Sequence, residues 1–220
     1  MHKRTSLLAA FALSLAVSGS SMAIDPAGAA PSTGDRRAAT PAGVTNADVL
    51  TVRNVAKALP AFKNGIREVA GVQRTSMPDP VDCEGERNPR VSSGRHATFT
   101  RAGDRVGPGT QVVLEQVDQF AKPATALRLM RTLKRYPAKC RVRRNDGTTS
   151  RTKRISIARL GDDRTAFRVR HRDENGVEEI TTYWVRVGKR LVSVLIYSDD
   201  VVRRPQAHAP LIRAAVRRAR

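Results

Sequence analysis

Four short segments with alternating apolar and polar residues follow one another in the second half of the chain, and they constrain the fold more than any other feature. They cover residues 154–160, 165–172, 178–187 and 190–198. Turn-forming residues separate them, namely Gly-Asp-Asp, Asp-Glu-Asn-Gly and Gly-Lys. Alternation with a period of two is typical of β-strands, and short turns join antiparallel strands. The pattern therefore predicts an antiparallel meander.

Three further segments have the pattern of helices. The first starts near Thr45, which with Asp48 resembles a capping box, and ends before Pro60. The second has Pro123 in its first turn and runs to Cys140. The third closes the chain and has its apolar residues on one side: Leu211, Ile212, Ala215, Val216 and Ala219.

Residues 111–120 are rich in valine and predict another strand, and a short strand is expected near 97–101. The prolines of 77–90 predict a loop around Cys83. Together these elements predict an α+β fold, in which amphipathic helices cover one face of an antiparallel sheet.

The beginning of the chain has the three parts of a secretory signal peptide. Lys3 and Arg4 precede an apolar run over residues 7–17, and Ser21-Met22-Ala23 matches a cleavage signature. We expect cleavage after residue 23, with an uncleaved membrane anchor as the alternative. No later apolar stretch is long enough to cross a membrane. The mature chain is therefore expected to be secreted or associated with the cell envelope.

Residues 24–43 contain mainly Ala, Pro, Gly, Ser and Thr and show no apolar period. Such a composition predicts a disordered tether, although an extended segment lying on the domain is the alternative. A single folded domain is expected over residues 44–220.

Cys83 and Cys140 are the only cysteines, and Cys140 lies among lysines and arginines such as Lys139 and Arg141. Neighbouring cations would stabilise a thiolate, but a nucleophile also needs a base, and no histidine is close in sequence. A zinc site would need more Cys or His ligands. In an exported protein, a single pair of cysteines usually forms a disulfide. We predict a Cys83–Cys140 disulfide and leave a free thiol as the alternative.

The formal net charge is +20, and arginine far outnumbers lysine. Arg168, Arg170 and Arg172 share one face of an expected strand, opposite Phe167 and Val169. Guanidinium groups bind phosphate through two hydrogen bonds, so we predict that this row faces solvent and binds an anionic ligand. The alternative is that the arginines only keep the surface solvated.

The sequence contains no recognised catalytic motif. Asp162 and Asp163 are adjacent in a turn, and His171 is expected to be a partly buried strand residue. We therefore expect no catalytic residue, cofactor or metal site. An enzyme whose residues come together only in the fold remains an alternative.

The order of these elements, with a helix that ends at a cysteine (ALRLMRTLKRYPAKC) and a hairpin VRVGKRLVSV, resembles the PknH-like extracellular sensor domains of actinobacterial envelope proteins. The likeness covers residue 45 to the end, but Tyr136 stands where the family often has Trp. The resemblance implies a mixed α/β fold with a ligand cleft and no established catalytic residues.

These observations lead to three expectations for function. The first is an exported binding or sensor-like domain without enzymatic activity, whose partner is an anionic envelope polymer, lipid head groups or a small ligand in a cleft. The second is an exported nucleic-acid-binding protein, which the low aromatic content of 4% disfavours because base stacking needs aromatic side chains. The third is an enzyme with a site assembled from distant residues.

Overall fold

The computed structural model describes residues 43–83, 85–103, 111–145, 147–174, 176–198 and 208–220. All of them belong to the second of the two units, Met1–Thr40 and Pro41–Arg220, into which the chain divides. The expected signal peptide lies outside the described residues, as does the expected tether apart from Gly43.

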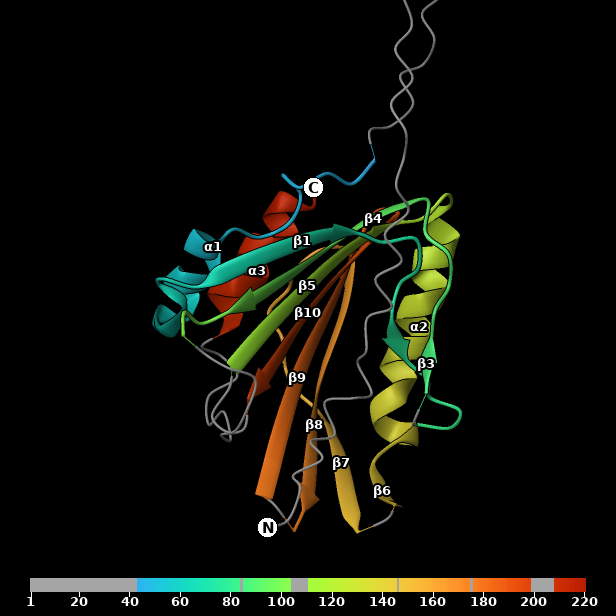
Figure 1. Ribbon diagram of the computed structural model, residues 1–220. Coiled ribbons are helices and arrows are strands. Elements are labelled where there is room, and N and C mark those ends of the chain that lie inside the picture. The colour runs from blue at the N-terminus through green and yellow to red at the C-terminus, as the bar shows by residue number, and fades with distance from the viewer. Residues whose placement is uncertain (1–42, 84, 104–110, 146, 175, 199–207) are drawn as a thin grey trace, which may run out of the picture. The chain divides into compact units, whose positions relative to one another are not determined.

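Eight strands form one antiparallel sheet in the order β1-β4-β5-β10-β9-β8-β7-β6 (Figure 1). Their bounds are β1 Ile66–Gly71, β4 Ser93–Thr100, β5 Gln111–Gln119, β6 Val142–Asn145, β7 Thr148–Arg154, β8 Asp163–Asp173, β9 Gly176–Val187 and β10 Arg190–Ser198. A separate two-stranded ladder joins β2 (Met77–Pro78) to β3 (Glu86–Arg87). Strands β6 to β10 are neighbours in chain order, so the predicted meander is present and is longer than expected.

The Gly-Lys turn of the predicted hairpin joins β9 to β10. Gly188 has a φ of +57°, a conformation that favours glycine because it lacks a Cβ atom. Its backbone N–H donates to Asp162 Oδ2 at 2.6 Å, which ties this turn to the turn that leads into β8.

The first strand of the meander does not lie where the alternation predicts. The strand is Thr148–Arg154, and residues 155–160 leave the sheet instead of forming it. The sequence of β7 contains no large apolar residue, so no alternation of apolar and polar residues is visible in it. The apolar residues of the following loop, Ile155, Ile157 and Leu160, pack against a core instead.

Strands β1 and β6 and the β2–β3 ladder were not predicted, and the strand expected at 97–101 is the longer β4. The first helix also begins later than predicted. α1 is Val52–Ala58, and its capping box is formed by Thr51 and Asn54 rather than by Thr45 and Asp48. Asp48 instead closes a turn, because its Oδ2 accepts from the Thr45 backbone N–H at 2.7 Å.

The other helices follow the prediction. The short 3₁₀ helix η2 (Pro60–Phe62) succeeds α1, so Pro60 marks its end as expected. α2 is Pro123–Lys139 with Pro123 at its start, and α3 is Ala209–Arg218. None of the helices in the described part of the chain is long and apolar enough to cross a membrane.

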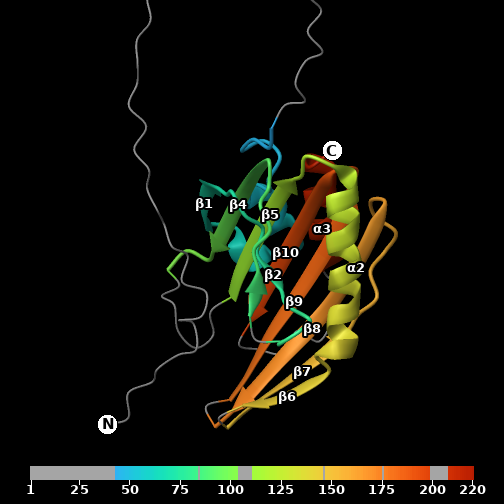
Figure 2. The ribbon, with the colours of Figure 1, turned by 90° about the vertical axis from the view of Figure 1, so that its right-hand side faces the viewer.

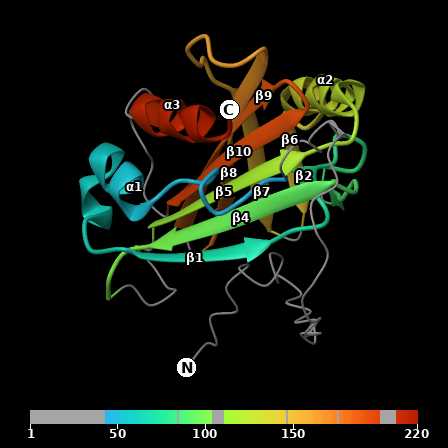
Figure 3. The same ribbon diagram turned by 90° about the horizontal axis from the view of Figure 1, so that it is seen from above.

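The helices cover both faces of the sheet, and not one face as predicted (Figure 2). Ala166, Tyr183 and Val194 belong to the core that contains α1 and α3, and the face that carries them is called the α3 face. Phe167 and Trp184, which alternate with them along the strands, belong to the core under α2, on the α2 face. Figure 3 shows α1 and α3 close together and apart from α2. The α+β class and the antiparallel sheet are confirmed.

Cys83 and Cys140 form the predicted disulfide, with Cα atoms 5.6 Å apart. Cys140 is the C-cap of α2, and its backbone N–H donates to the Tyr136 carbonyl at 2.8 Å. Cys83 lies in the turn between β2 and β3. The disulfide therefore attaches the end of α2 to the β2–β3 segment.

Candidate functional site

The predicted arginine row lies on the α3 face of β8. Arg168, Arg170 and Arg172 alternate with the buried Phe167 and Val169, which belong to the core on the other face. Strand periodicity therefore identified correctly which side chains share a face.

The neighbouring strand adds two cations to the row. Arg151 is the direct partner of Arg170 and Lys153 is the direct partner of Arg168 in the β7–β8 register. Directly paired residues of adjacent strands lie on the same face of a sheet. Arg151, Lys153, Arg168, Arg170 and Arg172 thus form one cluster, which we call the basic surface. Arg151, Lys153 and Arg172 are exposed.

A buried carboxylate holds two members of the basic surface in place. Glu179 on β9 is paired with Arg170 in the β8–β9 register. Its Oε1 lies 3.1 Å from Arg168 Nε and its Oε2 lies 3.2 Å from Arg170 Nη2. Only 1% of the Glu179 side chain is exposed, against 19% for Arg168 and 40% for Arg170. The row is therefore not made only of solvated guanidinium groups, and two of its members are anchored.

A buried tyrosine and histidine support the same face. Tyr183 Oη and His208 Nδ1 are 2.9 Å apart, and their rings meet edge to face. Burial and, to a smaller extent, the positive charge of Arg168 lower the pKa of His208 to about 4. Since the neutral ring is favoured, His208 connects the start of α3 to β9 without adding charge.

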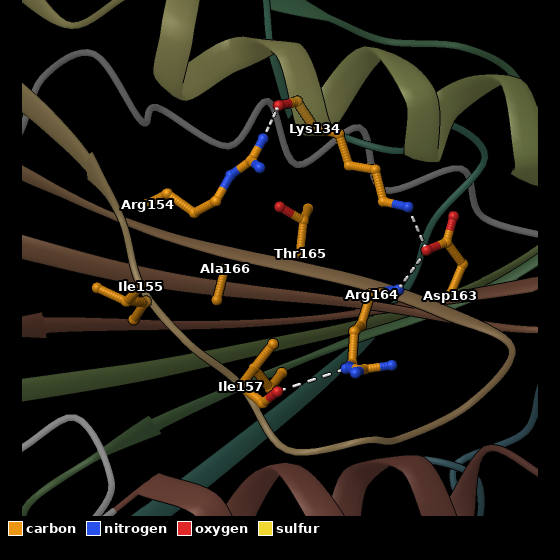
Figure 4. Close-up of a pocket in the computed structure, with 8 residues that line it drawn as sticks. All are labelled: Lys134, Arg154, Ile155, Ile157, Asp163, Arg164, Thr165 and Ala166. Atoms are coloured by element: carbon orange, nitrogen blue, oxygen red, sulfur yellow. Dashed lines mark hydrogen bonds and ion pairs between the residues drawn. The ribbon is translucent and has the colours of Figure 1, made fainter.

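A pocket of about 400 Å³ opens at the edge of the sheet where the chain leaves β7 (Figure 4). We call it the edge pocket. Its walls come from α2, from the loop after β7 and from the start of β8, and they consist of Lys134, Arg154, Ile155, Ile157, Asp163, Arg164, Thr165 and Ala166. The pocket was not predicted, because its residues meet only when α2 packs on the sheet.

Asp163, which was expected in a turn with Asp162, is the first residue of β8 and lines this pocket. Asp163 Oδ1 lies 2.5 Å from Lys134 Nζ and accepts from the Arg164 backbone N–H at 2.8 Å. Asp162 instead contacts Arg186 at 3.2 Å. The two neighbouring carboxylates therefore have separate partners and do not act as one unit.

His171 lies on the α2 face, and its Nδ1 is 2.7 Å from Ser150 Oγ on β7. Glu178 is its direct partner on β9. Burial lowers the pKa of His171, and the charge of Glu178 opposes this effect. Within the described ranges no carboxylate hydrogen-bonds to this ring, so the orienting contact of a catalytic triad is not present there. Nor do any three His, Cys, Asp or Glu side chains among the described residues group as metal ligands.

Two buried carboxyl groups on β5 were also missed. Glu115 Oε2 accepts from the Leu50 backbone N–H at 2.5 Å, and burial raises the pKa of Glu115 to about 8. Asp118 accepts from Gln116 Nε2 at 2.9 Å, and burial raises its pKa to about 6. Glu115 thus joins β5 to the segment before α1, whereas the hydrogen bond of Asp118 to Gln116 lies within β5. The only signal in the sequence is an acid within a valine-rich strand.

The fold and these sites define an α+β domain that is closed by one disulfide and carries a basic surface and an edge pocket. No family model matches the sequence, and no curated protein matches it.

Solved structures with a similar fold include two from mycobacteria. The extracellular domain of PknH from Mycobacterium tuberculosis has a TM-score of 0.48 and 12% identity, over 77% of this chain and 93% of that one. The Rv0999 ortholog from Mycobacterium smegmatis has a TM-score of 0.46 and 15% identity, over 77% of this chain and 96% of that one. The family that the sequence resembles thus recurs among similar structures. The likeness concerns the fold and carries no information about ligand or activity.

Proposed function

We propose that this protein is an extracytoplasmic binding domain without enzymatic activity, which holds a phosphate-bearing polymer or lipid surface against its basic surface. The observation that carries the proposal is the convergence of five cations from β7 and β8 on one face of the sheet around a single buried carboxylate.

The arrangement suits phosphate for geometric reasons. Successive side chains on one face of a strand are about 6.6–6.8 Å apart, and adjacent strands are about 4.8 Å apart. Five cations on such a grid present several donors to neighbouring phosphates at the same time. Because Glu179 fixes Arg168 and Arg170, less side-chain entropy is lost when an anion binds.

The extracytoplasmic location is part of the proposal. It is supported by the sequence of residues 1–23, which has the parts of a signal peptide, and by the disulfide, since disulfides persist in oxidising compartments. Residues 24–43 would then form the first segment of the mature chain.

The structure changes the design of the test. Replacing Arg168 or Arg170 would remove a partner of the buried Glu179. A loss of binding could then result from a less stable fold and not from a lost contact with the ligand. The informative variant therefore changes the exposed cations that Glu179 does not hold, Arg151→Gln, Lys153→Gln and Arg172→Gln. Its matched control is Arg213→Gln, Arg217→Gln and Arg220→Gln, which removes the same charge from exposed positions at the end of the chain.

Binding is measured with phosphatidylglycerol vesicles and, separately, with a soluble polyphosphate, so that a lipid surface and a polymer are distinguished. The variant with Arg151, Lys153 and Arg172 replaced is called the surface variant. We expect it to bind at least one of the two probes at least tenfold more weakly than the control does. Equal losses in both variants, or no binding by the parent protein, would contradict the proposal. A clear preference for single-stranded DNA over both probes would favour a nucleic-acid partner instead.

A further inference from the structure

The edge pocket exists because β7 ends before β8 does. The last paired residues are Arg154 and Phe167, after which the Ile155 N–H donates to the Ala166 carbonyl at 3.0 Å and the chain turns away. Residues 163–165 of β8 therefore have β9 on one side and no β7 partner on the other. α2 contributes Lys134 above this open edge (Figure 4).

One end of the pocket is polar and its groups are fixed. Arg154 Nη2 donates to the Lys134 carbonyl at 2.5 Å, and Lys134 Nζ lies 2.5 Å from Asp163. Figure 4 shows the Thr165 hydroxyl between Arg154 and Lys134. The guanidinium of Arg154 therefore keeps donors that the Lys134 carbonyl does not use.

Thr165 contributes a further donor at this end of the pocket. The residue is only 5% exposed, and Figure 4 shows its hydroxyl turned toward Arg154. A hydroxyl carries one O–H donor, so a ligand atom at this point could accept from both Thr165 and Arg154.

The remaining wall is apolar. Ile155, Ile157 and Ala166 line it, and the first two are only partly buried against the core on the α3 face. Arg164 closes the far end, where its Nε donates to the Ile157 carbonyl at 3.4 Å. The pocket thus joins a cationic end to an aliphatic surface.

The charges of the residues that line the pocket favour a negatively charged ligand. Lys134, Arg154 and Arg164 are opposed by the single carboxylate of Asp163, which Lys134 already contacts. The pocket volume of about 400 Å³ lies near the small end of the range for small-molecule sites. These properties fit a small anion with a short aliphatic chain better than they fit a neutral or cationic molecule.

We propose that the edge pocket is a second binding site, distinct from the basic surface, which takes a small amphiphilic anion. Its carboxylate or phosphate head accepts hydrogen bonds from Arg154 and Thr165, and its aliphatic chain lies on Ile155, Ile157 and Ala166. The site does not depend on the proposed function of the basic surface, since Arg154 points to the opposite face of β7 from Arg151 and Lys153.

The test is a calorimetric titration of the mature protein with octanoate and with octyl phosphate, which distinguish the two head groups, and with acetate, which lacks the chain. We expect saturable binding of at least one octyl ligand and at least tenfold weaker binding of acetate. No saturable binding of either octyl ligand would overturn the proposal, and so would acetate binding as tightly as octanoate.

Variants then test the assigned residues. Arg154→Gln should weaken binding at least tenfold. Thr165→Val, which keeps the branched side chain but removes the hydroxyl, should weaken it at least threefold. The control Arg159→Gln lies in the same loop but outside the lining, and should change affinity less than twofold. Equal effects of Arg159→Gln and Arg154→Gln would contradict the assignment. The surface variant with Arg151, Lys153 and Arg172 replaced should still bind the octyl ligand, so the two proposals can fail separately.

Discussion

Arg170 on β8 donates a hydrogen bond at 3.2 Å to Glu179, its direct partner on β9, whose side chain is almost completely buried. Arg168 approaches the other oxygen of the same carboxylate. This relationship restrains two of the five cations of the basic surface, because the buried carboxylate restricts long side chains that would otherwise move freely.

Loss of one partner of Glu179 should therefore affect stability more than loss of an unpaired cation. We expect Arg170→Gln to lower the free energy of unfolding by about 1–2 kcal/mol, a value reduced from that of a fully buried pair because Arg170 is partly exposed and Arg168 remains. Arg172→Gln on the same face should change it by less than about 0.5 kcal/mol. Urea unfolding of both variants measures the difference, and equal stabilities would show that the Glu179 contact contributes little.

Glu115 should make the protein less stable as the pH rises. Because burial raises its pKa from 4.5 to about 8, the folded protein keeps a proton on this carboxyl group that the unfolded chain releases. The resulting stability is complete below about pH 4.5 and is lost as the pH rises to about 8, with a slope on the order of 1 kcal/mol per pH unit. Glu115→Gln, which mimics the protonated group, should remove this part of the slope. Urea unfolding at pH 5, 7 and 8.5 provides the comparison, and parallel curves for the parent and the variant would refute the assignment.

The disulfide should contribute to stability through the loop that it closes. For a sequence separation of 57 residues, the chain-entropy relation gives about 4 kcal/mol. The double variant Cys83→Ala and Cys140→Ala should lose about this amount in urea unfolding, while the denatured, unreduced parent should show no free thiol. Two titratable thiols per chain would contradict the pairing.

The boundary of the folded domain should lie just before Val44. Val44 is buried and its N–H donates to Ser93 Oγ at 2.8 Å, while Asp48 contacts Arg190 at 3.1 Å. Deletion of residues 24–42 from the mature chain should leave the thermal midpoint unchanged within error. A deletion extended through Asp48 should lower the midpoint by several degrees, because it removes both contacts. A large drop with the shorter deletion would mean that the proposed tether packs on the domain.

The sequence was informative wherever the alternation of residues is strong. The alternation of Phe167 and Val169 with Arg168 and Arg170 predicted a strand, and it correctly assigned these residues to the two faces of the sheet. β7 was missed because Thr148–Arg154 lacks large apolar residues, and the visible alternation of the next residues belongs to a loop with two partly buried isoleucines. A local sequence pattern indicates which side chains are buried, but it does not distinguish a buried residue in a strand from a buried residue in a loop.

Features that depend on distant residues could not be predicted from the sequence. The partners of Glu179 follow from the β8–β9 register, and the contact between Lys134 and Asp163 requires α2 to pack on the sheet. The apolar residues Trp184 and Tyr183 stand next to each other in β9, which indicates a strand buried on both faces. That signal would have predicted helices on both sides of the sheet.

The measurement that tests the central claim most directly is the salt dependence of binding to the anionic probe that the parent protein prefers. Each phosphate contact that is lost lowers the slope of log affinity against log salt by about 0.7–0.9 for nucleic-acid polyanions, and we expect a similar size here. The variant Arg151→Gln, Lys153→Gln and Arg172→Gln should therefore show a slope that is smaller by about 2–3, while the control Arg213→Gln, Arg217→Gln and Arg220→Gln keeps the slope of the parent. Equal slopes for the two triple variants would contradict a defined binding surface on β7 and β8.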